Sequence, residues 1–361
     1  MTTAHVPTWP ILHTAGAPEP RVLQDILGLA AAAAEADGNP PLSEQTLVNL
    51  KTAGAHPGSL LVFATYAVDD DSAGGDPAGA SPDAEELAGV AVVSLPRTGT
   101  AANPDGDDRA AEGAAEGADE PGVLELVVRP TYRSQGVGTA LADAVQAHGL
   151  PNLRAWSHGN HAAAVSLATK NGFAPVRELW RMRQTRAALE ETVLSPTAEQ
   201  ISLPDGVVLR AFQPGVDEQA WLTANRAAFA HHAEQGSTTL EDLQARMAED
   251  WFDPAGFLLA VRESDGQLLG FHWTKVHPRS GDHPAMGEVY VVGVTPEAQG
   301  MGLGKALTIA GIEHLHGQGL QAIMLYVDAD NTAAVALYRK LGFTRWDVDV
   351  MYAPQVAEAS L

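Results

Sequence analysis

The sequence contains no cysteine, which excludes disulfides, thiolate metal sites and a cysteine nucleophile. Positive charge is also scarce, because 22 lysines and arginines oppose 45 aspartates and glutamates and leave a net charge of −23. This charge repels nucleic acid and anionic membranes, so we predict neither as a partner. An anionic ligand would need a local binding site.

Long apolar runs are missing as well. No stretch reaches the roughly 18 uninterrupted apolar residues of a membrane span, and the first residues lack the basic and apolar segments of a secretory signal. We therefore predict a soluble, cytoplasmic protein. Its 361 residues suffice for two domains with ordinary cores.

Two segments, 69–86 and 98–120, are acidic and rich in alanine, glycine and proline. Between Asp69 and Pro121, 14 acidic residues oppose two arginines. This composition is typical of solvated inserts, and an acidic surface for a protein partner is the alternative. A third segment, 187–205, contains two prolines without strand periodicity, and we interpret it as an interdomain linker.

The two halves of the sequence repeat each other. Residues 123–138 match 289–304 at an offset of 166, and residues 161–173 match 331–343 at an offset of 170. The matched segments share an apolar stretch, a proline, a glycine turn and a later Gly-Phe pair. This self-similarity indicates two tandem copies of one domain, 1–186 and 206–361.

Each copy shows strand hairpins followed by a βαβ unit, which predicts an α+β domain with a mixed sheet flanked by helices. In the second copy the expected strands are 207–212, 257–263, 268–276, 287–294 and 322–327, and the expected helices are 303–315 and 332–341.

The turn from Gln299 to Gly304 joins an apolar strand to a helix. Its glycines let the backbone approach a ligand, and successive N–H groups at a helix start can bind a pyrophosphate. A tight turn that only needs positive φ is the simpler interpretation. The recurrence of strand, proline, turn and helix in both halves favours anion or cofactor binding.

These motifs resemble those of the Gcn5-related N-acetyltransferase (GNAT) superfamily. The pattern Val-x-Pro-x-x-[Gln/Arg]-x-x-Gly-x-Gly is followed by Asn-x-x-Ala-x-x-x-Tyr-x-x-x-Gly-Phe. The resemblance implies an enzyme that transfers acetyl from acetyl-coenzyme A to an amine. Segments 232–236, 251–254, 270–278 and 287–294 are similar to those of tandem members that acetylate the cysteinyl amine of a glucosaminyl inositol, a small-molecule substrate.

By this resemblance, Glu288 is the base that removes a proton from the amine, and Tyr338 is the acid that protonates the departing thiolate. The residues alone leave other interpretations open. A strand glutamate is usually solvent-facing, Tyr338 could be a core residue, and Asn331 could be a plain helix N-cap.

The implied donor site includes backbone N–H groups that hold the acetyl carbonyl and the glycine turn that holds the pyrophosphate. In the second copy its residues are Val292, Gly293, Val294, Gln299, Gly300, Met301, Gly302, Leu303, Gly304, Lys305 and Asn331. In the first copy they are Leu126, Val127, Val128, Ser134, Gln135, Gly136, Val137, Gly138 and Thr139.

The implied substrate contacts are Glu44, Glu234, Lys275, Glu288 and Tyr326. Spacing alone would make Lys275 a surface lysine and Glu44 a helix N-terminal acid. We predict no metal site, because no recognised ligand spacing occurs among His231, His232, His272, His277 and His283.

Comparison of the two halves assigns the chemistry to the second. Glu288, Tyr338 and Asn331 correspond to Gly122, Ala168 and His161, whereas the glycine turn is kept as 134–139. The first copy is therefore either a non-catalytic acetyl-coenzyme A site or a structural support. Glu125 is a candidate for a displaced base, and the sequence leaves its direction open.

Two rival functions remain at the level of sequence. One is acetylation of another small amine, a peptide or an antibiotic, and the other is a non-catalytic acyl-coenzyme A-binding module. We expect a monomer, because the duplication already supplies a pair of domains within one chain.

Overall fold

The computed structural model describes residues 9–67, 86–96, 121–186, 202–230, 233–279 and 284–355. Except for Glu86 and residues 202–205, the acidic segments and the linker lie outside these ranges. The chain divides into two compact units, Met1–Glu178 with Val348–Leu361, and Leu179–Asp347. Residues 179–186 thus belong to the second unit and residues 348–361 to the first, an exchange that the linear repeat does not reveal.

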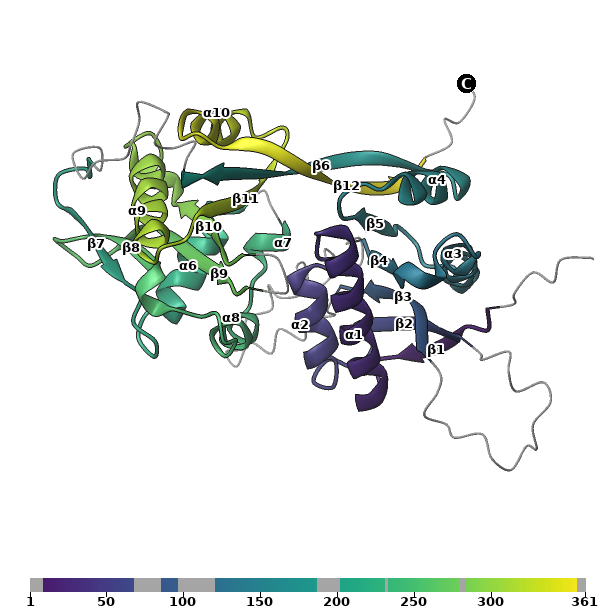
Figure 1. Ribbon diagram of the computed structural model, residues 1–361. Helices are drawn as coiled ribbons and strands as arrows, with labels where there is room; N and C mark the ends of the chain where they lie inside the picture. Colours follow the sequence, from purple (N-terminus) through teal and green to yellow (C-terminus); the bar gives the residue numbers. More distant parts are fainter. Residues whose placement is uncertain are drawn as a thin grey trace, which may run out of the picture. The chain divides into compact units, whose positions relative to one another are not determined.

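The first unit is a mixed sheet with helices on both faces (Figure 1). Its strand order is β1-β2-β3-β4-β5-β12, in which only β4 and β5 run parallel. Helices α1 and α2 pack on one face through apolar residues such as Ile26 and Leu50, and α3 packs on the other through Leu141. The elements are β1 (Leu12–Ala15), α1 (Pro20–Asp37), α2 (Glu44–Thr52), β2 (Leu60–Ala67), β3 (Glu86–Ser94), β4 (Val123–Val128), α3 (Val137–His148), β5 (Arg154–Ser157), α4 (Ala162–Lys170) and the end of β12 (Thr344–Pro354).

The second unit repeats this plan with the strand order β6-β11-β10-β9-β8-β7. Only β10 and β11 run parallel. Strand β6 spans Phe173–Thr185, and its part from Leu179 onward belongs to this unit. The other elements are β7 (Val207–Ala211), α6 (Glu218–Ala228), α7 (Ala233–Gly236), α8 (Leu240–Met247), β8 (Phe257–Arg262), β9 (Leu268–His277), β10 (Met286–Val294), α9 (Leu303–Gly317), β11 (Ala322–Asp328) and α10 (Thr332–Lys340).

The expected α+β fold is confirmed, and the strands and helices named from the second copy occur within two residues of their expected ends. The sequence patterns did not predict helices α6 to α8. Helix α6 buries Trp221 and Leu222, while α8 starts with a capping box between Thr239 and Asp242. These helices pack over the same face of the sheet as Trp273 and Val291.

Candidate active site

The sheet of the second unit opens beside the end of β10. Strand β10 pairs with β9 as far as Val294, with a register shift between Val289 and Val291 that marks a bulge at Tyr290. With β11 it pairs only from Gly287 to Val289, although both strands continue. The β10 edge from Val291 onward therefore has no ladder partner on β11, and its backbone groups can accept or donate hydrogen bonds to a ligand. The predicted residues Val292, Gly293 and Val294 lie on this edge.

The glycine turn after β10 has the conformation that a pyrophosphate site needs. Gly300 and Gly302 have φ of 80° and 79°, in the left-handed region that favours glycine. Gly302 caps α9 without a side-chain hydrogen bond, so no side chain occupies the first N–H groups of the helix. The residues present thus fit the pyrophosphate of acetyl-coenzyme A.

Glu288 lies on β10, one residue before the end of its pairing with β11. It is only 5 % exposed, and its Oε2 is 2.6 Å from Nε2 of His277. In the sheet register, Lys275 lies opposite Glu288 on β9 and Met324 lies opposite it on β11. Directly paired residues point to the same face, and Tyr326 shares that face because it lies two residues after Met324. The register therefore brings three predicted substrate residues, Lys275, Glu288 and Tyr326, to one face.

Two aromatic rings hold Lys275 on this face. Its Nζ lies 4.4 Å from the ring centroid of Trp251 and 5.2 Å from that of Tyr290. The hydroxyl of Tyr290 accepts a hydrogen bond from Nε of Arg246 at 2.9 Å. Cation–π contacts of this kind restrict the ammonium group to a defined position. The position of Tyr290 in the strand results from the bulge, which no sequence motif predicted.

Tyr338 lies on α10, where its ring packs 5.9 Å from that of Phe343. It joins the apolar cluster of Val289 and Leu325, whose side chains point away from the Glu288 face. Burial raises the pKa of Tyr338 to about 12, so the phenol is protonated at neutral pH. Glu288 and Tyr338, the predicted base and acid, thus belong to opposite faces of the sheet.

Asn331 caps α10, because its Oδ1 accepts a hydrogen bond from the N–H of Ala334 at 3.1 Å. The N-cap interpretation is therefore correct, and it leaves the amide nitrogen available to a ligand. The described structure does not test the other two predicted substrate contacts. Glu234 belongs to α7, but its side chain lies outside the described part, and Glu44 begins α2 in the first unit.

The glycine turn of the first unit keeps the same backbone shape. Ser134 and Gly136 have φ of 63° and 89°, matching Gly300 and Gly302. In contrast to β10, strand β4 pairs regularly with β3 from Val123 to Val128, without a bulge. The predicted residues Leu126, Val127 and Val128 lie on this regular strand.

Glu125 points into a buried polar network, which answers the question of its direction. Both carboxylate oxygens accept hydrogen bonds from the N–H of Ser43, at 3.0 and 3.1 Å, and Oε1 is 2.9 Å from Nε2 of His158. Nδ1 of His158 is 3.0 Å from Oδ2 of Asp349. Burial acts to lower the pKa of His158, but the hydrogen bonds and charges of Asp349 and Glu125 raise it to about 10. The Glu125 carboxylate is therefore occupied as an internal ion-pair partner.

The histidine set of the second unit shows no metal centre among the described residues, where no group of three or more candidate ligands is found. His231, His232 and His283 lie outside the described ranges. Burial lowers the pKa of His272 to about 4, and its Nδ1–H donates to the carbonyl oxygen of Leu307 at 2.7 Å. His272 is thus a neutral core residue. No helix in the described ranges is long and apolar enough to cross a membrane.

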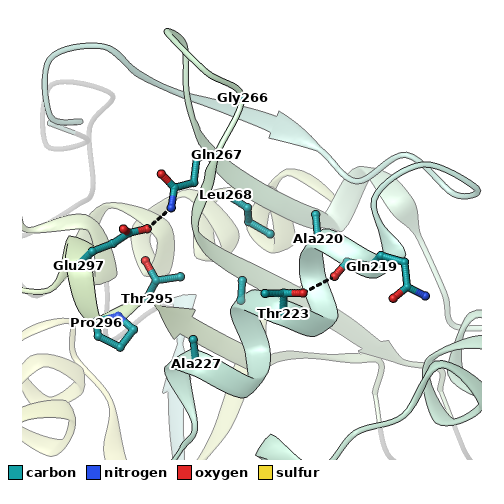
Figure 2. Close-up of a pocket in the computed structure, with 11 residues that line it drawn as sticks. Gln219, Ala220, Thr223, Ala227, Gly266, Gln267, Leu268, Thr295, Pro296 and Glu297 are labelled. Atoms are coloured by element: carbon teal, nitrogen blue, oxygen red, sulfur yellow. Dashed lines mark hydrogen bonds between the residues drawn. The ribbon is translucent and has the colours of Figure 1, made fainter. Parts of the chain in front are cut away.

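A groove of about 690 Å³ lies beside α6, and Figure 2 shows its lining. One wall is α6 from Gln219 to Ala227, and the opposite wall is the turn that leads into β9 together with residues 295–297. A hydrogen bond from Gln267 to Glu297 closes part of one side. The groove contains none of the predicted donor, substrate or catalytic residues.

Comparisons with known proteins agree with this geometry. The model of the acetyltransferase (GNAT) family matches residues 64–173 and 220–343, so the chain belongs to this family. It is 61 % identical to a mycothiol acetyltransferase of Paenarthrobacter aurescens (strain TC1), over 98 % of this chain and 99 % of that one. A mycothiol acetyltransferase of Arthrobacter sp. (strain FB24) is 57 % identical over the same shares.

Solved structures support the fold alone. A tandem GNAT protein from the clavulanic acid biosynthesis pathway has a TM-score of 0.62 at 18 % identity, over 97 % of this chain and 100 % of that one. A Gcn5-related N-acetyltransferase from Sphaerobacter thermophilus has a TM-score of 0.57 at 24 % identity, over 96 % of both chains. The resemblance drawn from the sequence motifs is confirmed.

Proposed function

We propose that this chain is the enzyme that transfers the acetyl group of acetyl-coenzyme A to the cysteinyl amine of desacetylmycothiol, giving mycothiol. The observation that carries the proposal is the buried Glu288 at the opening of the sheet, with Lys275 and Tyr326 on its face and Tyr338 on the other. High identity to mycothiol acetyltransferases over nearly the full chain supports this substrate.

In this proposal, separate residues of the chain bind the substrate, accept the amine proton and protonate the leaving group. Glu288 takes a proton from the substrate amine, whose reference pKa of about 7.7 to 8.0 requires only a modest base. Lys275 and Tyr326 orient the substrate beside it, together with Glu234. Tyr338 donates its proton to the leaving sulfur.

The donor would be held by the open edge of β10 at Val292, Gly293 and Val294, by the turn from Gln299 to Lys305 and by Asn331. Bound there, acetyl-coenzyme A supplies an activated thioester. The N–H groups of the β10 edge stabilise negative charge on the carbonyl oxygen, because they are fixed before the reaction starts. The absence of cysteine excludes an acyl-cysteine intermediate, which agrees with direct transfer.

The second unit carries the catalysis in this proposal, whereas the first unit binds acetyl-coenzyme A at Ser134 to Thr139 or supports the fold. Glu125 cannot act as its base while it is paired with Ser43 and His158. The cytoplasmic location and the monomeric state stay predictions.

The first test is release of the coenzyme A thiol by purified protein that is given acetyl-coenzyme A and desacetylmycothiol. Replacement of the base, Glu288→Gln, should lower kcat by about 10² to 10⁴ with little change in the KM for acetyl-coenzyme A. Glu263→Gln is the control, because it makes the same chemical change at an exposed position directly after β8.

Other outcomes separate the rival functions. Turnover of polyamines or aminoglycosides but not of desacetylmycothiol would keep the enzyme class and reject the substrate. Tight binding of acetyl-coenzyme A without turnover of any amine would indicate a binding module.

A further inference from the structure

We propose that His277 is the proton exit of the active site, which takes from Glu288 the proton that the substrate ammonium gives up and passes it to solvent. The inference rests on the proposed function, since it needs an amine that loses a proton at Glu288. His277 acts through Glu288 and does not itself touch the substrate.

The geometry that carries this inference is a buried carboxylate bonded to a half-exposed imidazole. Nε2 of His277 lies 2.6 Å from Oε2 of Glu288, which is within hydrogen-bond distance. The side chain of His277 is 37 % exposed, whereas that of Glu288 is 6 % exposed. A proton held by Glu288 therefore has little direct access to bulk water, and the imidazole offers it a route.

The position of His277 on the hairpin makes the contact part of the fold. His277 is the last residue of β9 and pairs with Met286 on β10, two positions before Glu288. Because Lys275 and His277 lie two residues apart on one strand, both point to the Glu288 face. The two side chains approach Glu288 from one strand, Lys275 directly opposite and His277 diagonally.

The proton balance of the relay is simple. The substrate is mostly an ammonium ion at neutral pH, and one N–H proton moves to Glu288 to give a neutral amine and a carboxylic acid. Glu288 then transfers this proton to Nε2 of a neutral His277, and the resulting imidazolium loses its Nδ1 proton to water. Exchange with bulk water through the exposed edge of the ring restores the starting tautomer. The nitrogen loses its second proton as the amide forms, and this proton replaces the one that Tyr338 gives to the sulfur. One proton is therefore released to solvent per turnover.

Several groups face the pair from the neighbouring strands or follow it in the chain. Lys275 faces Glu288 from β9, Arg183 lies in the same transverse row on β6 through its pairing with Met324, and Arg279 follows two residues after His277. From β11, the residue paired with Glu288 is the uncharged Met324.

The test is chemical rescue of a variant that lacks the imidazole. In His277→Ala, kcat in a dilute, non-transferring buffer should fall by about tenfold or more, while the KM for acetyl-coenzyme A stays the same. Added imidazole should restore kcat with a saturable dependence on its concentration. His277→Gln should behave in the same way, because glutamine can donate a hydrogen bond to Glu288 but cannot carry a proton.

Two controls define the result. His314→Ala removes another histidine that lies near a carboxylate, 3.4 Å from Asp253, and should be neither slow nor rescued by imidazole. The double variant His277→Ala with Glu288→Gln should be slow and not rescued, because the proton no longer reaches the relay position.

The outcomes separate the two proposals. Full activity of His277→Ala in dilute buffer, or a slow variant that ignores the imidazole concentration, would overturn the relay while the proposed function stands. Full activity of His277→Gln would assign His277 only to orienting the carboxylate and would also overturn the relay. Absence of turnover by the unchanged protein would overturn the proposed function and the relay together.

Discussion

The surroundings of Glu288 and Tyr338 differ in polarity, which suits the opposite roles proposed for them. Glu288 is buried but has a polar partner in His277, whose Nε2 lies 2.6 Å from its Oε2. Tyr338 packs against Phe343 within an apolar cluster, where burial raises its pKa to about 12. A group with such a pKa stays protonated over the whole working range and can act only as an acid.

Replacement of this acid is expected to slow the chemical step. Tyr338→Phe should lower kcat by about 10² with little loss of acetyl-coenzyme A binding, because the ring still packs against Phe343. Between pH 6 and about pH 10 the unchanged protein should show no decline in kcat from ionisation of Tyr338. The measurement is kcat against pH, with Tyr352→Phe as a control at a tyrosine bonded to Asn160 at 2.7 Å. A kcat of Tyr338→Phe equal to that of the control would reject the acid role.

At the scale of elements, the strand–turn–helix segment is the unit that the repeat preserved. Both copies place a left-handed residue two positions before a left-handed glycine, and both start the helix without a side-chain cap. They differ in the first left-handed residue, which is Ser134 in one copy and Gly300 in the other. A residue with a Cβ pays about 1 kcal/mol or more for that conformation, so the first copy keeps the turn shape in spite of strain.

This strain can be measured. Ser134→Gly should raise the free energy of unfolding of the first unit by up to about 1 kcal/mol, reduced somewhat by the larger entropy of glycine in the unfolded chain. The reverse change, Gly300→Ser, should destabilise the second unit by a similar amount. Urea unfolding of the two variants checks both signs. A destabilised Ser134→Gly would mean that the serine side chain stabilises the turn more than its backbone strain costs.

At the scale of the whole molecule, the first unit is built from two separate pieces of chain, whereas the second unit is the continuous segment Leu179–Asp347. The end of β12 completes the sheet of the first unit by pairing with β5, from Val350 with Ser157 to Tyr352 with Ala155. Asp349 on this strand binds His158, which binds Glu125 on β4. Stability of the first unit therefore depends on a residue near the other end of the sequence.

The polar network predicts how stability changes with pH. The folded-state pKa of His158 is raised to about 10, so its contribution is fully present below about pH 6.5 and is lost as pH rises through 10. Burial acts to raise the pKa of Glu125, but its hydrogen bond and charge interaction with His158 lower it. Its contribution is therefore present above about pH 4.5 and lost as the pH falls.

The first unit should accordingly be most stable between about pH 4.5 and pH 6.5, where both groups contribute, and should lose stability steadily towards pH 10. His158→Gln should cost about 3 to 5 kcal/mol, because it leaves two buried carboxylates without a cation, and it should flatten the alkaline decline. Denaturant unfolding at several pH values between 5 and 10 is the measurement. An alkaline decline of equal slope in both proteins would exclude His158 as its origin.

The sequence predicted much of the fold, because the strands, helices and turns follow from patterns among neighbouring residues. Alternating apolar residues, the glycine turns and the internal repeat predicted the α+β class and the strands and helices of the second copy. Motif spacing also predicted the glycine turn and the N-cap at Asn331, since both depend on neighbouring residues. The roles of Glu288 and Tyr338 rest on family resemblance and stay predictions, with which the burial of both side chains is compatible.

Only the tertiary structure decided the features that depend on register and on contacts between distant segments. The bulge at Tyr290, the bond from His277 to Glu288 and the pairing of Glu125 with His158 each require strand alignment that no local pattern encodes. The exchange of segments 179–186 and 348–361 between the units is of the same kind. Local propensity determines which residues form a strand, but hydrogen bonding and packing across the sheet determine which strand lies beside it and which side chains meet.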